Sequence, residues 1–426
     1  MKSPAIKSSL CFLLAAKRCE MADLQQLTQT SDLVRRTAVL IHELQRERGL
    51  SNLYTASGGE RFRQERAQQM EQSDRAAQAL RAGFDDLDTE PTRHGARLFS
   101  RIAYALHGLE ALTQLRAQVD NLQATPMQLS ADYARLIATL LSVVFEAADT
   151  ASDLPLSKLL VALFHLMQGK ELAGQERATG SAMLAAGRCQ ADAQQRLIHL
   201  IESQDRCLQV FESFASEDLL ELWQRCRVPQ FHFDLERLRR LLCSTPANQT
   251  LDTAKSTLWF DCCSQRMDEM RLVEDQLTKL LVERCQHRLQ RVGSEVQQIE
   301  ALKTRLSTPS CTIDPLDAAP LFEEAATDGH ATTQSLGPAL EKSVLGLVQE
   351  QATRLQALSA ELEHVRASLN ERKLIERAKG LLMAHQQLSE EAAHKALRDL
   401  AMRQNRRMVD VAQAVLSMAT LLSPKS

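Results

Sequence analysis

Apolar residues recur at intervals of three and four positions through most of the chain, which is the spacing of one face of an α-helix. Between Met21 and Leu306, proline occurs only at positions 91, 126, 155, 229 and 246, so long helices can run between these points. The sequence has no sustained period-2 alternation and no hairpin dipeptide between β-branched runs. We predict an all-α protein with about eight helices here, several of about 25 residues or more. Their expected ends or starts are Gly58-Gly59, Pro91, residues 124–126, Pro155, Gly187 and Pro246.

Helices of this length bury their apolar stripes most simply by packing antiparallel to one another. We therefore expect residues 21–306 to form one or two four-helix bundles. Residues 1–20 contain a short apolar run that ends in Lys17 and Arg18, which makes a poor signal peptide. We interpret residues 1–20 as a disordered N-terminal extension, with Met21 as an alternative start.

The sequence changes character after residue 306. Residues 307–342 carry four prolines among Ser, Thr, Ala and Gly, which predicts an exposed linker. From Val344 to Leu369, apolar residues follow a heptad pattern that Gln351 interrupts. Such a seam needs a partner helix, which either a homodimer or the protein's own bundle would supply. Residues 343–424 are therefore expected to form a C-terminal unit that begins with this coiled-coil helix.

Three short helical stretches fill the rest of this unit. Their apolar stripes are Leu374, Ala378 and Leu381, then Ala393, Leu397 and Leu400, then Val411 or Ala412 with Val415, Ala419 and Leu422. Ser389 suits an N-cap for the second stretch, because two acidic residues follow it where the helix dipole favours them. The pattern predicts a three-helix module with a thin core.

Composition limits the chemistry that the chain can perform. Ten cysteines are scattered without a CxxC pair or a His pair at ligand spacing, so we expect no metal site and no disulfide framework, and a cytoplasmic location fits. Adjacent Cys262 and Cys263 are interpreted as buried thiols. Because no nucleophile and base pair or glycine-rich phosphate loop appears, we expect neither an enzyme nor a cofactor. No segment approaches the ~20 apolar residues that span a membrane.

Charge is divided unequally along the chain. The whole protein has a formal net charge of −3, whereas residues 371–426 carry ten Lys and Arg against six Asp and Glu. A compact basic module on an acidic remainder is typical of a nucleic-acid-binding tail, although a solvated helix face would carry the same charges. Helical spacing places Arg372, Lys379 and Met383 on one face of the first short helix, and Arg398 and Asn405 on one side of the second.

Two predicted helices carry an arginine where the apolar stripe calls for an aliphatic residue. Arg48 continues the stripe of Val34, Ile41 and Leu44, and Arg177 continues that of Leu163, Leu166 and Ala173. A guanidinium taken out of water without a partner costs several kcal/mol. An internal ion pair with Glu47, Glu176 or another acid would satisfy each arginine singly. Two inward arginines at equivalent places can instead share one small planar anion.

The last segment resembles the ANTAR domain, the RNA-binding module of transcription antiterminators. The resemblance rests on residues 377–383 (RAKGLLM), residues 389–392 (SEEA), Leu397-Arg398, Ala401-Met402, Asn405 and residues 410–412 (DVA). It implies a three-helix domain that binds paired stem-loops of a leader mRNA and prevents a terminator hairpin from forming. On the matched positions, it implies RNA contacts at Lys379, Arg398 and Asn405, with Arg372, Arg377 and Arg407 as secondary candidates.

The N-terminal region resembles the NIT domain, a nitrate- and nitrite-sensing module of bacterial receptors. This resemblance rests on residues 44–51 (LQRERGLS) with Gly58-Gly59 and on residues 174–180 (GQERATG). It implies two antiparallel four-helix bundles with nitrate between them, bound by Arg48 and Arg177, with Arg46 and Arg237 as secondary candidates. The two runs share the pair Glu-Arg, but the second has Ala178-Thr179 where the first has Gly49-Leu50. Equal roles for the two arginines therefore do not follow.

The order of the two domains is similar to that of nitrate-responsive antiterminators. We expect a one-component regulator in which nitrate or nitrite, bound by residues 21–306, releases the C-terminal module to bind leader mRNA. The alternative hypothesis is a helical scaffold or DNA-binding regulator whose basic tail contacts duplex phosphates. Competition between a two-hairpin RNA and duplex DNA of equal charge would separate the two hypotheses.

Overall fold

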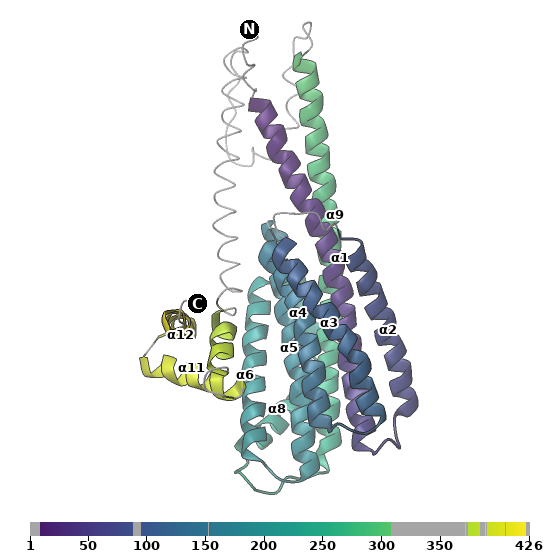
Figure 1. Ribbon diagram of the computed structural model, residues 1–426, viewed down its shortest axis with the longest axis vertical. Coiled ribbons are helices and arrows are strands. Elements are labelled where there is room, and N and C mark those ends of the chain that lie inside the picture. Colours follow the sequence, from purple (N-terminus) through teal and green to yellow (C-terminus); the bar gives the residue numbers. More distant parts are fainter. Residues whose placement is uncertain are drawn as a thin grey trace.

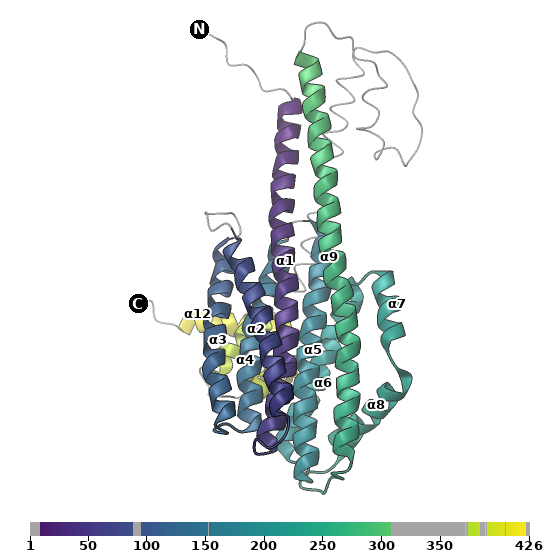
Figure 2. The same cartoon turned by 90° about the vertical axis from the view of Figure 1, so that its right-hand side faces the viewer.

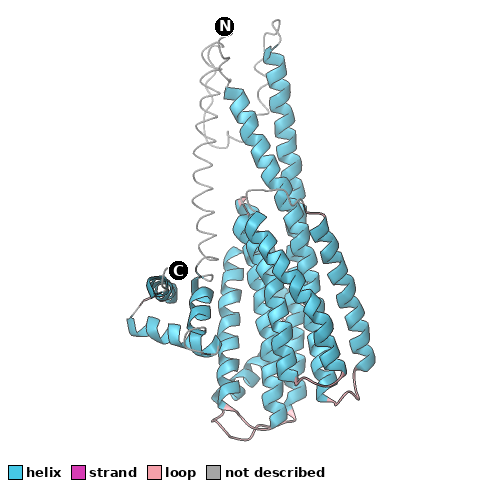
Figure 3. Cartoon of the chain, viewed as in Figure 1, coloured by secondary structure: helices cyan, strands magenta, loops and turns pink. Residues whose placement is uncertain are grey.

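The computed structural model describes residues 9–87, 95–151, 153–307, 371, 374–383, 388, 390–404 and 406–422. Within these ranges every regular element is a helix (Figure 3), so the predicted all-α class is confirmed. The expected linker beyond Ser307 and the heptad helix up to residue 369 lie outside the described residues. None of the described helices combines the length and the apolar content needed to cross a bilayer.

Residues 9–307 form nine helices that group into two sets of four, with one short addition. The first bundle is a ring in which α1 packs against α2 and α4, which both pack against α3. In the second bundle, α5 and α8 each pack against α6 and α9, and the short α7 packs against α9. The helices are α1 (Ser9–Ala56), α2 (Arg63–Asp85), α3 (Gly95–Asp120), α4 (Pro126–Thr150), α5 (Leu154–Ala186), α6 (Ala191–Phe214), α7 (Glu217–Cys226), α8 (Pro229–Ser244) and α9 (Lys255–Ser307).

Helices α1 and α9 are the longest elements, and they project together beyond both bundles (Figures 1 and 2). They contain 48 and 53 residues, which corresponds to lengths of ~70 and ~80 Å. The expectation of disorder up to residue 20 is wrong from Ser9 onward. Those residues are helical because Leu14 is buried in the core and Lys17 forms an ion pair with Glu295 of α9 at 2.7 Å. Tertiary contacts thus order a segment whose short apolar run gives little sign of a long helix.

Local signals place the helix ends near their expected positions. Thr125 caps α4 by accepting a hydrogen bond from the backbone of Gln128, and proline follows at the first helical turn. Asp153 caps α5 in the same way. Gly187 ends α5 with φ of 63°, a left-handed conformation that glycine adopts at low cost. Pro91 lies outside the described residues.

The C-terminal module consists of a helical stretch over residues 374–383, α11 (Glu390–Gln404) and α12 (Met408–Leu422). Its small core contains Ala378, Leu397, Ala401, Val411 and Ala412. The module lies beside α6 of the second bundle (Figure 1).

Gly180 sets how closely α5 approaches α9. A Cβ atom at this position would lie 2.2 Å from the ring of Trp259, which is fully buried. We expect Gly180→Ala to destabilise the protein by about 1–3 kcal/mol, because the ring cannot move without disturbing the core. The measurement is urea unfolding followed by circular dichroism.

Gly293→Ala in α9 is the matched control. No atom lies within 4 Å of a Cβ built there, so this variant should gain up to about 1 kcal/mol from helix propensity. Equal stability gains in the two variants would contradict the close packing of Gly180 against Trp259.

Candidate functional site

Arg48 and Arg177 lie at the junction of α1 and α5, where the two bundles meet. Arg48 is 2% exposed and reaches across to α5, where its two terminal nitrogens donate to Glu171 at 2.5 and 3.1 Å. A Cβ at Gly174 would lie 2.4 Å from Nη2 of Arg48. Glycine at position 174 is therefore what lets the guanidinium lie flat against α5.

Arg177 crosses the same junction in the opposite direction. Its Nη2 lies 3.3 Å from where a Cβ of Gly49 on α1 would be, so each arginine reaches a glycine on the other's helix. Nη1 of Arg177 donates to the hydroxyl of Ser264 at 2.8 Å, and the guanidinium lies 4.8 Å from the ring centroid of Phe260. No carboxylate among the described residues forms an ion pair with Arg177. Burial, and next the positive charge of Arg48, lower the pKa of Arg177.

The junction therefore holds two neighbouring cations and one carboxylate in contact with only one of them. Glu171 is 4% exposed, and besides Arg48 it accepts hydrogen bonds from Gln45 and Gln175, each at 3.0 Å. Its acceptor capacity is thus committed to α1 and to its own helix. A planar monovalent anion placed between Arg48 and Arg177 would relieve their repulsion and give Arg177 a negatively charged acceptor in addition to the hydroxyl of Ser264.

Neither Glu47 nor Glu176 neutralises the arginine that follows it in the sequence. Glu47 is fully buried inside the first bundle, where Arg116 of α3 donates to both of its oxygens at 2.8 and 2.9 Å. The hydroxyl of Tyr133 on α4 donates to it at 2.8 Å. Burial disfavours the charged form of Arg116, but the hydrogen bonds and charge of Glu47 outweigh it and raise the pKa.

Glu176 is bound in the same way inside the second bundle. Arg239 of α8 donates to both oxygens of Glu176 at 2.7 Å, and the side-chain amide of Gln204 on α6 donates at 2.5 Å. Adjacent residues on a helix point about 100° apart, so each glutamate faces its own bundle while the next arginine faces the junction. The sequence allowed an internal ion pair for each arginine. Among the described residues the structure contains such a pair for Arg48, with Glu171.

Arg116, Arg239 and Glu171 were not selected from the sequence as site residues. A signal for the two arginines exists, because each occupies a stripe position: Arg116 lies between Leu112 and Val119, and Arg239 between Leu235 and Leu242. Glu171 gives no such signal, because its role depends on the approach of α1.

The secondary candidates of the sensor region, Arg46 and Arg237, are both exposed. Arg46 is exposed on α1, with Glu43 at 3.8 Å and Gln72 at 3.4 Å. Arg237 lies on the exposed side of α8, while Arg239, two positions later, points inward. Cys262 and Cys263 are both buried, and burial raises the pKa of each thiol. The described part of the chain contains no cluster of His, Cys, Asp and Glu suited to a metal.

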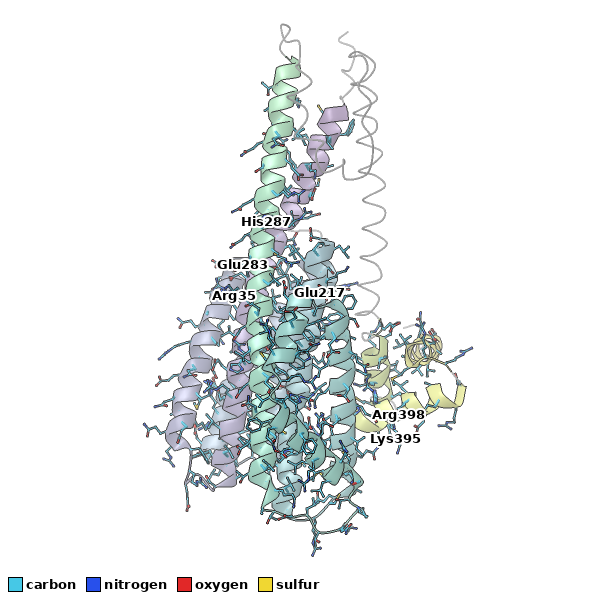
Figure 4. The ribbon with its side chains drawn as sticks, turned by 180° about the vertical axis from the view of Figure 1, so that it is seen from behind. Arg35, Glu217, Glu283, His287, Lys395 and Arg398 are labelled. Atoms are coloured by element: carbon cyan, nitrogen blue, oxygen red, sulfur yellow. The ribbon has the colours of Figure 1, made fainter. Side chains whose placement is uncertain are left out.

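The C-terminal module is held against α6 through its second helix. Arg398 donates to both oxygens of Glu202 at 3.3 and 3.0 Å. Figure 4 labels Arg398 and Lys395 on α11 where the module meets the second bundle. The guanidinium proposed for RNA is therefore engaged by a carboxylate of the N-terminal region.

A histidine pair adds to the same contact. The ring of His394 on α11 packs edge-on against that of His199 on α6, with centroids 4.6 Å apart. Arg206 places a terminal nitrogen 3.5 Å from Nε2 of His394. His394 is 6% exposed, and burial followed by the charges of its neighbours lowers its pKa to about 3. His394 is thus neutral in the docked module.

The other RNA candidates differ in their exposure to solvent. Lys379 is 5% exposed, and its ammonium group bonds to Glu376 at 2.9 Å. Arg377 and Arg407 are exposed, and Arg407 lies within ion-pair distance of Asp410 and Glu371. Asn405 and Arg372 lie outside the described residues.

Fold and site together define a class of protein. A large helical body with a cationic junction between two bundles is joined to a small basic three-helix module, which is the layout of a sensor attached to an effector.

Comparison with known proteins makes the class specific. Residues 39–282 match the NIT family, described as nitrate and nitrite sensing, and residues 363–416 match the ANTAR domain. The "Nitrate regulatory protein" of Klebsiella oxytoca is 34% identical over 425 residues, which cover 96% of each chain. The solved structure of the NasR transcription antiterminator is 30% identical with a TM-score of 0.61, and the match covers 96% of this chain and 98% of that one.

The chain belongs to the NasR-type family of nitrate-responsive antitermination regulators, which join a NIT sensor domain to an ANTAR RNA-binding domain. Both matched modules are regulatory, so the protein is a regulator rather than an enzyme.

Proposed function

We propose that nitrate or nitrite binds between Arg48 and Arg177 and releases the ANTAR module to bind a leader mRNA. The observation that carries this proposal is Arg177, a half-buried guanidinium beside another cation whose hydrogen-bond acceptor among the described residues is the hydroxyl of Ser264. The secondary candidates Arg46 and Arg237 are left out, because both are exposed. The junction of α1 and α5 is then the sensing site.

Anion binding shifts the docking equilibrium only by its differential affinity for the docked and released forms. An anion shared between Arg48 and Arg177 would offset the repulsion between the two guanidinium groups and draw α1 and α5 closer together. The proposal requires that this shorter distance between α1 and α5 be incompatible with the contact between α6 and α11, so that the module is released.

Support for a route between the two sites comes from α6. Gln204 of α6 donates to Glu176, which directly precedes Arg177, at 2.5 Å. Glu202 and Arg206 lie two positions to either side of Gln204 and contact the ANTAR module. A displacement of α5 at Arg177 therefore acts on α6 at the turn that holds the module.

Docking and RNA binding draw on the same side chains. Arg398, engaged by Glu202, is the guanidinium that the ANTAR resemblance assigns to RNA, and Lys379 is buried in the docked form. Phosphate and carboxylate suit the planar fork of arginine equally, so RNA has to compete with Glu202. Released, the module would bind two hairpins of a nascent transcript and prevent the terminator from forming. A homodimer through residues 343–369 remains part of the proposal.

Arg177→Met tests the ligand assignment. Arg177 forms no ion pair with a described acid, and Asp268, whose carboxylate it attracts, is exposed, so its loss leaves no buried carboxylate unpaired. We expect nitrate affinity to fall about 10- to 150-fold, the value of a charged hydrogen bond of about 1.5–3 kcal/mol. Calorimetric titration of the full chain with nitrate measures it, with Arg75→Met on exposed α2 as the control. Undiminished nitrate binding in Arg177→Met would disprove the site.

Glu202→Gln tests the docking contact. We expect this variant to bind a two-hairpin RNA about two- to fivefold more tightly than the native chain when nitrate is absent, since a half-exposed ion pair is worth about 0.2–1 kcal/mol. Asp192→Asn, the same charge change on the exposed start of α6, should leave the affinity unchanged. Fluorescence anisotropy measures it, with duplex DNA as competitor. Equal affinities for both variants would refute docking through Glu202.

A pH dependence follows from His394. Its pKa is about 3 when docked and rises toward its ordinary value of 6.5 when released, so docking is stabilised above pH 6.5 and weakens as pH falls. The RNA affinity without nitrate is divided by the RNA affinity at saturating nitrate. This ratio should rise about tenfold when the pH is lowered from 7.5 to 5.5. The groups facing His394 are His199, Glu202 and Arg206 of α6 and Lys379 and Arg398 of the module.

The variant His394→Gln provides the control, because glutamine does not titrate. Its relative RNA binding should change less between the two pH values than that of the native chain. An identical pH profile in both proteins would remove His394 from the switch.

A further inference from the structure

The interior of the second bundle holds a charge imbalance that the sensing junction does not use. Arg239 and Arg266 are 5% and 7% exposed, and Glu176, 1% exposed, is the buried carboxylate that interacts with both. Both oxygens of Glu176 are bound by Arg239 at 2.7 Å, and Gln204 adds a third hydrogen bond. Glu176 therefore has little capacity left for a second guanidinium.

Arg266 of α9 is the cation left over. It makes no hydrogen bond or ion pair with any described residue, and its Nε is buried without an acceptor. Burial, and next the charge of Arg239, lower the pKa of Arg266 to about 10, so the side chain stays protonated at neutral pH. Burying a guanidinium whose Nε has no acceptor is unfavourable, and a bound anion would supply that acceptor.

The neighbouring side chains do not supply that counter-ion. Cys263, one turn earlier on α9, has a pKa raised well above its ordinary value by burial and by Glu176, so its thiol is neutral. Asp205, which also attracts Arg266, lies on the exposed side of α6. Leucines and Trp259 form the core of this bundle, so a bulky or divalent ion does not fit the surroundings.

We infer that Arg266 binds a small monovalent anion of the nitrate or halide class inside the second bundle. The nitrogens of neighbouring Arg239 already donate to Glu176, Glu236 and Gln204, so Arg266 would be the ligand. This site is distinct from the junction of Arg48 and Arg177. The two sites lie on different sides of α5. Glu176 faces into the second bundle and interacts with Arg266, whereas Arg177 faces α1 and bonds to Ser264. The anion would neutralise the surplus positive charge of Arg266.

Bromide is the probe for this site. The full chain is unfolded by heat in sodium bromide, sodium nitrate or sodium gluconate at one ionic strength, because gluconate is too large to enter. At ten times its dissociation constant, bromide should raise Tm by about 2–4 °C in a saturable manner. Arg177→Met alters only the junction, so this variant should keep the rise in Tm. A saturable rise in its Tm with bromide or with nitrate supports the inference.

Arg266→Met is the decisive variant. It removes the surplus charge, so it should fold as stably as the native chain in gluconate and lose the bromide-dependent rise. The same rise in Arg266→Met as in the native chain would mean a general salt effect and overturn the inference. Crystals of the native chain grown in bromide give a second readout that needs no variant. An anomalous peak beside Nε of Arg266 supports the site, and its absence at saturating bromide overturns it.

Discussion

A guanidinium group inside a helical bundle is stable only while an acceptor lies against it, and this constraint organises the N-terminal domain. Each of its two repeats solves the problem in the same way. The glutamate of the Glu-Arg pair turns into its own bundle and takes an arginine from another helix: Arg116 for Glu47, and Arg239 for Glu176. Each glutamate is therefore not available to the arginine that follows it, and that arginine points to the other bundle. The buried pairs thus balance the charges of Glu47 and Glu176 inside their own bundles, and Arg48 and Arg177 lie at the junction.

The two junction arginines are not equivalent, and the difference has a mechanical consequence. Arg48 is anchored to α5 by Glu171, so α1 and α5 already share one ion pair. Arg177 contacts a hydroxyl and an aromatic face on α9, which hold it in place without neutralising it. An anion arriving at the junction changes the surroundings of Arg177 far more than those of Arg48. Movement is therefore expected on the α5 side, and α5 is the helix whose Glu176 contacts α6.

Local signals in the sequence predict most of the helix ends, because caps, prolines and the glycine at position 187 act within one turn of their own position. The inward direction of Arg48 and Arg177 also follows from the stripe. The partners of buried charges are less predictable, since Arg116 and Glu47 are 69 positions apart and Arg48 and Glu171 are 123 apart. Helical order from Ser9 and the burial of Lys379 likewise depend on neighbours that periodicity does not identify.

The weakness of the docking contact is what suits it to control by a small ion. A ligand that binds the released form a hundred times more tightly supplies about 2.7 kcal/mol, and it cannot release a module held more firmly than that. The contacts between α6 and α11 include a half-exposed ion pair and a histidine contact beside Arg206, and an ion pair of this kind falls within this range. A large apolar interface in the same place would hold the module permanently. The small core that the ANTAR module keeps to itself, centred on Leu397 and Val411, leaves the surface facing α6 polar and reversible.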